Sequence, residues 1–182
     1  MNITLRPIEQ SDMEFLYRVY ASTREAEMAM VDWTDEQKEA FVQMQFAAQH
    51  SHYQQYYTGA SFLVILADGQ PVGRLYVDHW TDQIRIVDIV VIPEYRNAGI
   101  GTALLKELIA EGARTGKPVT IHVEQYNPAL SLYERLGFTR MGERGVYYLM
   151  ECRTSAPEAP EAPEAPEAPE ASQAAETPGA EG

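Results

Sequence analysis

A charged and glycine-rich segment lies where an apolar run gives way to a helical pattern. The segment Arg96-Asn97-Ala98-Gly99-Ile100-Gly101 follows Pro93 and opens the amphipathic run at 99–116. The first amides of a helix have no partner within the helix, and the helix dipole makes that end positive. Glycines let an anion approach the backbone, and arginine adds donors that suit phosphate. The segment has the parts of a phosphate-binding turn, although a plain tight turn would use the same residues.

Two common nucleotide-binding motifs do not match this segment. A dinucleotide-binding fingerprint needs a third glycine where Leu104 stands,. A phosphate-binding loop of the Walker type needs a Gly-Lys-Ser/Thr sequence, which is absent,. The glycines therefore need a different structural context to explain them.

The surrounding patterns predict a mixed α/β chain. Alternating or β-rich runs predict strands at 2–8, 81–93 and 117–124, a hairpin at 61–80 turning at Asp68-Gly69, and two strands in 138–151,. Capped or helically spaced runs predict helices at 11–22, 34–57, 99–116 and 127–137,. This order, β-α-α-β-β-β-α-β-α-β-β, favours a mostly antiparallel sheet with helices on both faces.

Two segments carry a resemblance to a known family. Residues 91–101, VIPEYRNAGIG, resemble the acetyl-CoA signature of the GNAT superfamily of N-acetyltransferases, in which Arg/Gln-x-x-Gly-x-Gly/Ala follows a strand that ends in proline. Residues 127–138, NPALSLYERLGF, are similar to the second signature of that superfamily. The order and spacing of the two segments also match, and the resemblance covers about residues 2–151. It implies the GNAT fold, with central strands that splay apart at the acetyl-CoA site.

The resemblance implies a set of cofactor-binding residues. Free backbone groups of the splayed strand would pair with pantetheine, the amides of 96–102 would take the pyrophosphate, and the start of the last helix would add a contact and a helix cap. The residues so implied are Ile89, Val90, Val91, Arg96, Asn97, Ala98, Gly99, Ile100, Gly101, Thr102, Asn127 and Tyr133. Ordinary strand burial and helix capping would explain several of them equally well.

The resemblance also implies the proton-transfer groups. Tyr133 would be the general acid that reprotonates the departing thiolate; without the motif it reads as a buried aromatic residue,. The base would be a carboxylate or histidine on the central strands. Asp88 interrupts an apolar strand, where an unpaired charge is costly, and His122 has a side chain whose ordinary pKa suits the task,. Glu124, on the same face as His122, ranks third. Each of the three could instead be a paired structural group.

The acceptor region in this superfamily comes from the first two helices and their connection. Gln45, Gln49, His52 and Tyr56 share one face of the long helix, which either lines an acceptor groove or is solvated,. Trp33 is either an aromatic wall of the acceptor region or a core anchor, and the core anchor is favoured. The acidic residues Glu25, Glu27 and Asp32 hint at a cationic acceptor. The spacing of His50 and His52 does not favour a metal site.

Composition separates residues 1–153, the expected acetyltransferase domain, from 154–182, an acidic Pro/Glu/Ala-rich segment expected to be disordered,. Seven of the 27 acidic residues and none of the 14 basic ones lie in 154–182, which leaves a net charge of −6 for residues 1–153. Neither part has the basic surface of a nucleic-acid-binding protein. No apolar run of about 18 residues predicts a membrane span, and the N-terminus does not resemble a secretory signal,. With Cys152 as the single cysteine, the cytoplasm is the expected compartment,.

The implied function is transfer of an acetyl group from acetyl-CoA to a primary amine by direct attack. The acceptor would be a small-molecule amine or a protein or peptide amine, and a homodimer is compatible with the superfamily. Two alternatives stay open: a non-catalytic CoA-binding or adaptor domain that uses the acidic segment for docking, and a transferase of longer acyl chains.

Overall fold

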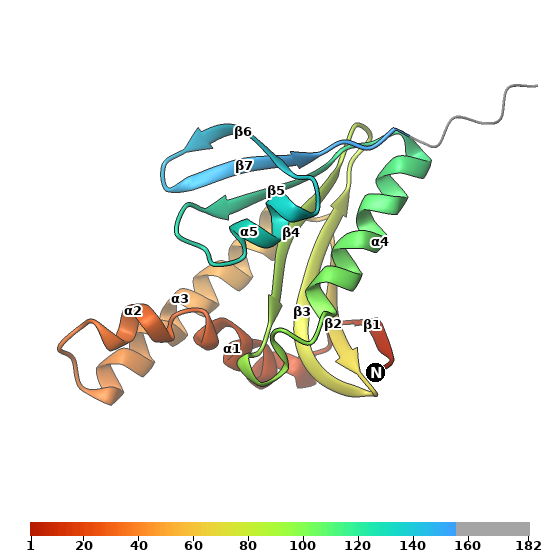
Figure 1. Ribbon diagram of the computed structural model, residues 1–182. Coiled ribbons are helices and arrows are strands. Elements are labelled where there is room, and N and C mark those ends of the chain that lie inside the picture. Colours follow the sequence, from red (N-terminus) through yellow and green to blue (C-terminus); the bar gives the residue numbers. More distant parts are fainter. Residues whose placement is uncertain (156–182) are drawn as a thin grey trace, which may run out of the picture.

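Seven strands form one twisted sheet in the computed structural model, which describes residues 1–155 (Figure 1). The spatial order is β1-β2-β3-β4-β5-β7-β6, and every neighbouring pair is antiparallel except β4 with β5. The strands are β1 (Ile3–Pro7), β2 (Ser61–Ala67), β3 (Gln70–His79), β4 (Ile84–Val91), β5 (Val119–Glu124), β6 (Thr139–Arg144) and β7 (Tyr147–Cys152). The predicted mostly antiparallel sheet is confirmed.

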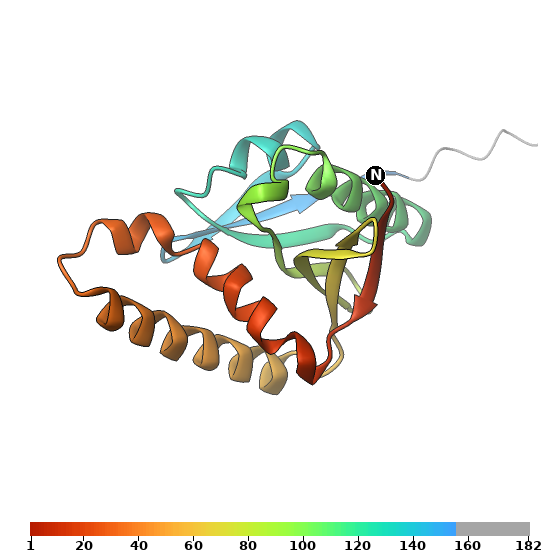
Figure 2. The same ribbon diagram turned by 90° about the horizontal axis from the view of Figure 1, so that it is seen from below.

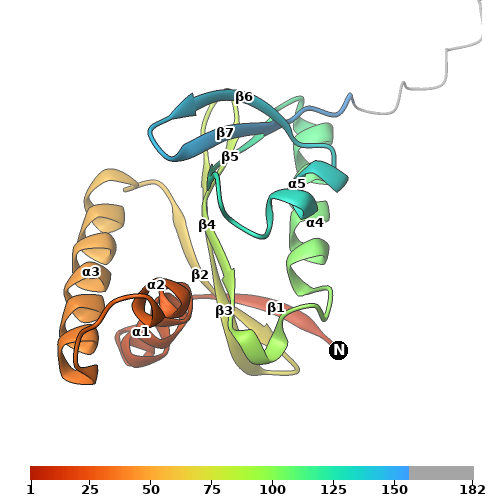
Figure 3. The same cartoon turned by 60° about the vertical axis from the view of Figure 1, so that its left-hand side comes forward.

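Helices cover both faces of this sheet, as predicted (Figures 2 and 3). One face carries α1 (Met13–Ser22), α2 (Glu25–Ala29) and α3 (Asp35–Tyr56), and the other carries α4 (Ile100–Thr115) and α5 (Leu130–Arg135). Two 3₁₀ turns, η1 (Gln10–Asp12) and η2 (Pro93–Tyr95), precede α1 and follow β4. The short helix α2 was not predicted, because its five residues bury nothing and show no apolar periodicity,.

Apolar side chains divide between two cores. The larger core lies between the sheet and the α4–α5 layer, and it includes alternate residues of β5 and one face of α4. The smaller core joins α1 to α3 through Leu16, Tyr20, Val42 and Phe46. Because strand side chains alternate between faces, the residues of β5 that face away from the larger core, Thr120, His122 and Glu124, face the α1–α3 layer,.

Short sequence signals mark where the helices and strands begin and end. The Thr34 hydroxyl accepts a bond from the Gln37 amide, and the Gln37 side chain accepts one from the Thr34 amide, which forms a capping box at the start of α3,. Asp68 and Gly69 both have positive φ, at 48° and 81°, as a two-residue hairpin turn of this kind requires,. The helix pattern at 99–116 and its terminal glycine are likewise confirmed.

The sheet is weakest at its one parallel pair. The ladder between β4 and β5 joins only Ile84–Ile86 to Val119–Ile121, and beyond it the two strands diverge (Figure 1). Residues 88–91 of β4 then pair only with β3, and residues 122–124 of β5 pair only with β7. The strands predicted to splay therefore do so.

Two further expectations concern the rest of the chain. Trp33 is not a core anchor: it is 43% exposed and packs edge-to-face against Phe41, in the second turn of α3. The expected disordered segment at 154–182 lies, from residue 156 on, outside the described residues. Within 1–155, no helix is both long and apolar enough to cross a membrane.

Candidate functional site

The candidate site is the opening between β4 and β5, together with the turn that follows β4. Ile89 and Val91 pack on the α4 side, so Asp88 and Val90 face the α1–α3 layer,. All four residues are half-buried and have no strand partner on the β5 side. The Ile92 amide bonds the Val72 carbonyl, so by the alternation of the ladder Val90 bonds to β3 and the amides of Ile89 and Val91 point into the opening,. These amides are free to pair with an extended ligand chain.

The turn after β4 places the first predicted glycine, Gly99, at a positive φ that favours glycine,. Asn97 and Gly99 have positive φ of 60° and 83°, and Gly99 is the residue that precedes α4. A Cβ added at Gly99 or Gly101 would meet nothing within 4 Å, so the space in front of this turn is open. The first intrahelical bond runs from the Ala103 amide to the Gly99 carbonyl. The amides from Asn97 to Thr102 are therefore available to an anion at the positive end of a 16-residue helix, whereas the Arg96 amide donates to the Pro93 carbonyl at 3.2 Å,.

Arg96 connects this turn to the rest of the site. Its Nε donates to the Val91 carbonyl at 2.9 Å, and its Nη2 donates to Ser22 Oγ at 3.3 Å. The side chain thus ties the end of β4 to the end of α1. Its other donors remain free for an anion at the turn.

Tyr133 extends from α5 into the core beneath the opening. It is 4% exposed and packs edge-to-face on Phe138. Burial, with a smaller contribution from the nearby Asp88 carboxylate, raises the pKa of the Tyr133 phenol above its ordinary value. The phenol is therefore protonated at neutral pH and can donate a proton. The charge of Asp88, which faces the other side of the sheet, still affects its pKa.

Asn127 does not cap α5 directly. The helix begins at Leu130, and Ala129 occupies the N-cap position, where no side chain makes a capping bond. Asn127 Oδ1 instead accepts a bond from the Ala129 amide at 2.8 Å, in the turn that leads into the helix. The predicted capping role is wrong in position because a local side-chain turn precedes the first helical residue.

Asp88 is held by a buried arginine. Arg74 Nη2 lies 2.5 Å from Asp88 Oδ2, and the same guanidinium donates to Gln49 Oε1 on α3 at 2.8 Å. Arg74 is 2% exposed and depends on this carboxylate for its counter-charge,. Asp88 therefore has a structural partner as well as a place at the opening.

His122 and Glu124 also have arginine neighbours. Arg85 Nη1 lies 3.2 Å from His122 Nδ1, and burial together with the charges of Arg85 and Arg144 lowers the pKa of His122. Glu124 lies 3.8 Å from Arg24, whose guanidinium also bonds Glu27 at 2.8 Å. Of the three base candidates, Glu124 has the loosest cationic partner.

Sequence reasoning missed the two buried arginines of the site. Arg74 stands in the apolar run VGRLYV and Arg85 in QIRIVDIVV. The argument that singled out Asp88, a charge inside an apolar strand, applies equally to both arginines and could have identified them.

Other residues considered from the sequence lie in different surroundings. The face of α3 expected to line a groove or be solvated divides: Gln45 and Gln49 bond Tyr20 and Arg74, whereas His52 and Tyr56 are exposed. Cys152 is buried against the Leu136 carbonyl, and burial raises the pKa of its thiol. No cluster of metal-binding side chains occurs within residues 1–155.

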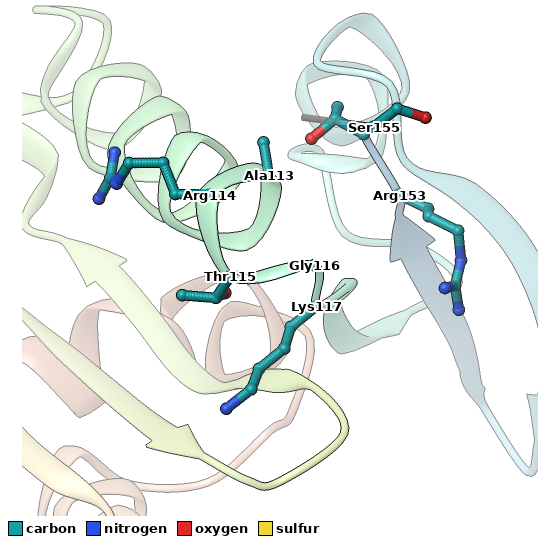
Figure 4. Close-up of a pocket in the computed structure, with 8 residues that line it drawn as sticks. Ala113, Arg114, Thr115, Gly116, Lys117, Arg153 and Ser155 are labelled. Atoms are coloured by element: carbon teal, nitrogen blue, oxygen red, sulfur yellow. The ribbon is translucent and has the colours of Figure 1, made fainter. Parts of the chain in front are cut away.

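A separate hollow lies at the far end of α4 (Figure 4). It has a volume of about 490 Å³ and is formed by residues 113–117 and 153–155, with Arg114 and Lys117 beside it. This is the negative end of the helix dipole, and the helix rises roughly 24 Å between the two ends. The hollow therefore has no part in the opening between β4 and β5.

The chain belongs to the acetyltransferase (GNAT) family, whose model matches residues 22–138. This range contains the whole opening, the glycine turn and Tyr133. The family suggested by the two sequence signatures is thereby confirmed.

Named relatives match parts of the chain. The ribosomal protein bS18-alanine N-acetyltransferase of Haemophilus influenzae is 29% identical over 47% of this chain and 60% of its own length. The streptothricin acetyltransferase of Streptomyces lavendulae is 32% identical over 48% of this chain and 49% of its own. The mouse cysteine-rich protein 2-binding protein is 46% identical over 28% of this chain, a match that spans only 6% of that protein.

Solved structures show the same fold. A PaiA N-acetyltransferase from Thermoplasma acidophilum, crystallised with coenzyme A, has a TM-score of 0.64 at 21% identity, covering 85% of this chain and 100% of that one. The ribosomal-protein-S18-alanine N-acetyltransferase of Escherichia coli has a TM-score of 0.57, also at 21% identity, over 88% of this chain and 97% of its own.

Proposed function

We propose that this protein is an N-acetyltransferase that moves an acetyl group from acetyl-CoA to a primary amine. The observation that carries the proposal is the opening of the β4–β5 ladder beside the glycine turn of α4. The names of the relatives, which include protein and small-molecule N-acetyltransferases, support an amine as the acceptor.

The residues present suit coenzyme A. The free edge of Ile89–Val91 offers backbone groups to the amide-containing pantetheine arm. The amides from Asn97 to Thr102 would bind the pyrophosphate, in the space left open by Gly99 and Gly101,. Arg96 would remain anchored to Val91 and add a charged donor. When bound, acetyl-CoA supplies the acetyl group as a thioester.

The chain itself would contribute orientation and proton transfer. An amide on the free edge of β4, that of Ile89 or Val91, would donate to the carbonyl oxygen as negative charge develops there,. As the amine nitrogen bonds to the acetyl carbon and the carbon–sulfur bond breaks, Tyr133 would give its proton to the sulfur. Its raised pKa keeps that proton available at neutral pH.

The amine proton would go to a base on the α1–α3 face. The charge of Asp88 contributes to the raised pKa of Tyr133, and His122 and Glu124 lie on the neighbouring strand β5. Partial burial and the charges of Arg85 and Arg144 lower the pKa of His122, and Asp88 and Glu124 each lie beside an arginine partner. We therefore propose that proton removal runs through water to this set, with Asp88 as the leading candidate; the predicted base role of His122 is disfavoured because its Nδ1 lone pair faces the Arg85 guanidinium,.

Titration calorimetry with acetyl-CoA tests the cofactor site. Gly99→Glu should abolish saturable binding, since it places a carboxylate where the pyrophosphate belongs. Gly69→Glu is the matched control, because its φ of 81° imposes the same backbone strain and its added Cβ likewise meets nothing. Equal binding by wild type and both variants would refute the site.

Turnover is tested by thiol release with a library of primary amines. We expect acetyl-CoA-dependent release with at least one amine, and loss of release in Gly99→Glu. Binding of acetyl-CoA without turnover of any amine would favour the adaptor alternative instead.

A further inference from the structure

Arg85 is a buried cation without a carboxylate partner. It is 9% exposed, and no aspartate or glutamate among residues 1–155 lies within ion-pair distance of it. Its hydrogen-bond acceptors are neutral: Thr120 Oγ1 at 2.8 Å, Gln83 Oε1 at 3.2 Å and His122 Nδ1 at 3.2 Å. Tyr57 and, beyond ion-pair distance, Asp82 act against the effect of burial on the pKa of Arg85. The Trp80 ring covers the guanidinium at 4.8 Å.

Two other arginines that are partly or fully buried form ion pairs with carboxylates. Arg74 bonds Asp88, and Arg6 bonds Asp12 through both of its terminal nitrogens. A buried charge without a partner is costly, so proteins retain one where a ligand supplies the missing charge or where function requires it. Burial accordingly lowers the pKa of Arg85, although an arginine stays protonated at neutral pH,.

Arg85 also fixes the protonation of His122. A guanidinium has only donors, so the Nδ1 atom that it contacts must carry the lone pair,. The neutral ring then bears its proton on Nε2, for which no acceptor is present among the described residues. His122 is exposed on the α1–α3 face, so this N–H is offered to a ligand there.

A second arginine strengthens the positive potential at this point. Arg144, at the end of β6, is exposed; its cross-strand row runs through Tyr147 of β7 to Glu124, and its charge lowers the pKa of His122. His122 is the first residue of β5 beyond the ladder with β4, so the group it binds would lie at the edge of the opening. Glu124, two residues farther along the same face, lies roughly 7 Å away and could face an amine,.

We propose that the acceptor amine carries a carboxylate, which binds the Nε2–H of His122 and Arg144 and neutralises the charge of Arg85. The acceptor class is thus a short aminocarboxylate: a free amino acid, or a peptide whose amine lies near an acidic side chain. The inference rests on the proposed function and narrows its substrate. The sequence suggested a cationic acceptor because of Glu25, Glu27 and Asp32. The buried charge of Arg85 favours instead an acceptor that carries a negative charge.

Paired substrates test the proposal. Acetylation of the common amino acids is compared with that of their carboxamides, which keep the amine and lose the negative charge. We expect the best amino acid or acidic peptide to exceed its amide by at least about tenfold in kcat/KM, as a charge-assisted bond provides. Peptides with Asp or Asn as the second residue separate the peptide source from the free amino acid. An active enzyme that uses acids and amides equally would overturn the proposal.

Variants assign the preference to these residues. Arg85→Gln and Arg144→Gln should each reduce the acid-to-amide ratio at least about threefold while leaving acetyl-CoA affinity unchanged. Arg85→Lys keeps the charge and should retain more of the ratio than Arg85→Gln. Arg114→Gln, an exposed position at the far end of α4, is the control. A ratio that persists in both glutamine variants would refute the assignment, and Arg144→Gln serves if Arg85→Gln does not fold.

Binding gives a readout that does not need turnover. Succinate, a dicarboxylate without an amine, should raise the pKa of His122 measured by NMR, with the signal assigned by its loss in His122→Gln. Succinamide should leave that pKa unchanged. This measurement stands even if no amine is acetylated, so the two failures can be told apart. No response of His122 to succinate at tens of millimolar would overturn the anion site.

Discussion

The Asp88 carboxylate lies 2.5 Å from the guanidinium of Arg74, and the two side chains connect β4 to β3 on the face covered by α3. A residue placed at the opening for chemistry is thus also the counter-charge of the most deeply buried arginine in the described chain. A mutation of Asp88 could therefore lower activity either by destabilising the fold or by removing a catalytic group. A second mutation at its partner Arg74 separates the two effects.

Asp88→Asn should lower the free energy of unfolding by roughly 3–5 kcal/mol, because it leaves a buried guanidinium without its counter-charge. Removing both charges, in Arg74→Met with Asp88→Asn, should recover most of that loss. Urea unfolding of the two variants checks both statements. An Asp88→Asn midpoint equal to wild type would contradict them, and a low kcat that persists in the stabilised double variant would assign Asp88 to the chemistry.

Tyr133→Phe should lower kcat by about 10²–10⁴-fold if the phenol is the general acid, with little change in acetyl-CoA affinity. Because burial raises the pKa of Tyr133, the wild-type rate should not fall through phenol ionisation at any pH below about 10, the ordinary value,. Steady-state kinetics across pH check this, with the exposed Tyr56→Phe as control. Undiminished turnover by Tyr133→Phe would remove the acid role.

Stability should fall as the solution is acidified through the ordinary histidine pKa, near 6.5. The folded protein holds the pKa of His122 below that value, so below pH 6.5 the unfolded chain binds the proton more readily,. His50, whose pKa is also lowered by burial, acts in the same direction. The contribution of Asp12, whose pKa is lowered by Arg6, is lost only below about pH 4,.

Urea unfolding at pH 7.5 and 5.5 measures this dependence. Wild type should lose stability between the two values, and His122→Gln should lose less. An identical pH dependence in the two proteins would show that His122 does not contribute.

Gly73→Ala should destabilise the protein and weaken acetyl-CoA binding together. A Cβ at Gly73 would lie 2.2 Å from the Val90 carbonyl oxygen, so β4 must move away from β3 where it borders the opening. We expect a loss of about 1–3 kcal/mol, the range for overpacked sites. Gly142→Ala, whose added methyl meets nothing within 4 Å, should change neither property. Calorimetry and thermal unfolding of both variants provide the test.

Much of the fold could be predicted because its signals are local. The capping box at Thr34, the turn at Asp68-Gly69 and the alternation in β5 each depend on a few neighbouring residues. Helix α2 lacked such a signal, since it buries none of its side chains.

The electrostatics of the site could not be predicted in the same way. Arg85 meets Thr120 and His122, 35 and 37 positions farther along the chain, only because β4 and β5 pair in parallel. Asp88 meets Arg74 through the register of a hairpin that contains a bulge. These relationships depend on which strands become neighbours. From residue types alone, one cannot decide whether Asp88, His122 or Glu124 has a charged partner.

The three-residue ladder between β4 and β5 makes the sheet two half-sheets, β1–β4 and β5–β7, joined by a narrow seam. The site lies where the seam stops. A ligand that pairs with the free edge of β4 would extend the hydrogen bonding of the sheet into the gap, so binding would complete the fold as well as position a reactant. Hydrogen exchange of the backbone amides along 88–91 should therefore slow when a ligand fills the opening between β4 and β5. The ligand would then stabilise the junction of the two half-sheets, which no single side chain does.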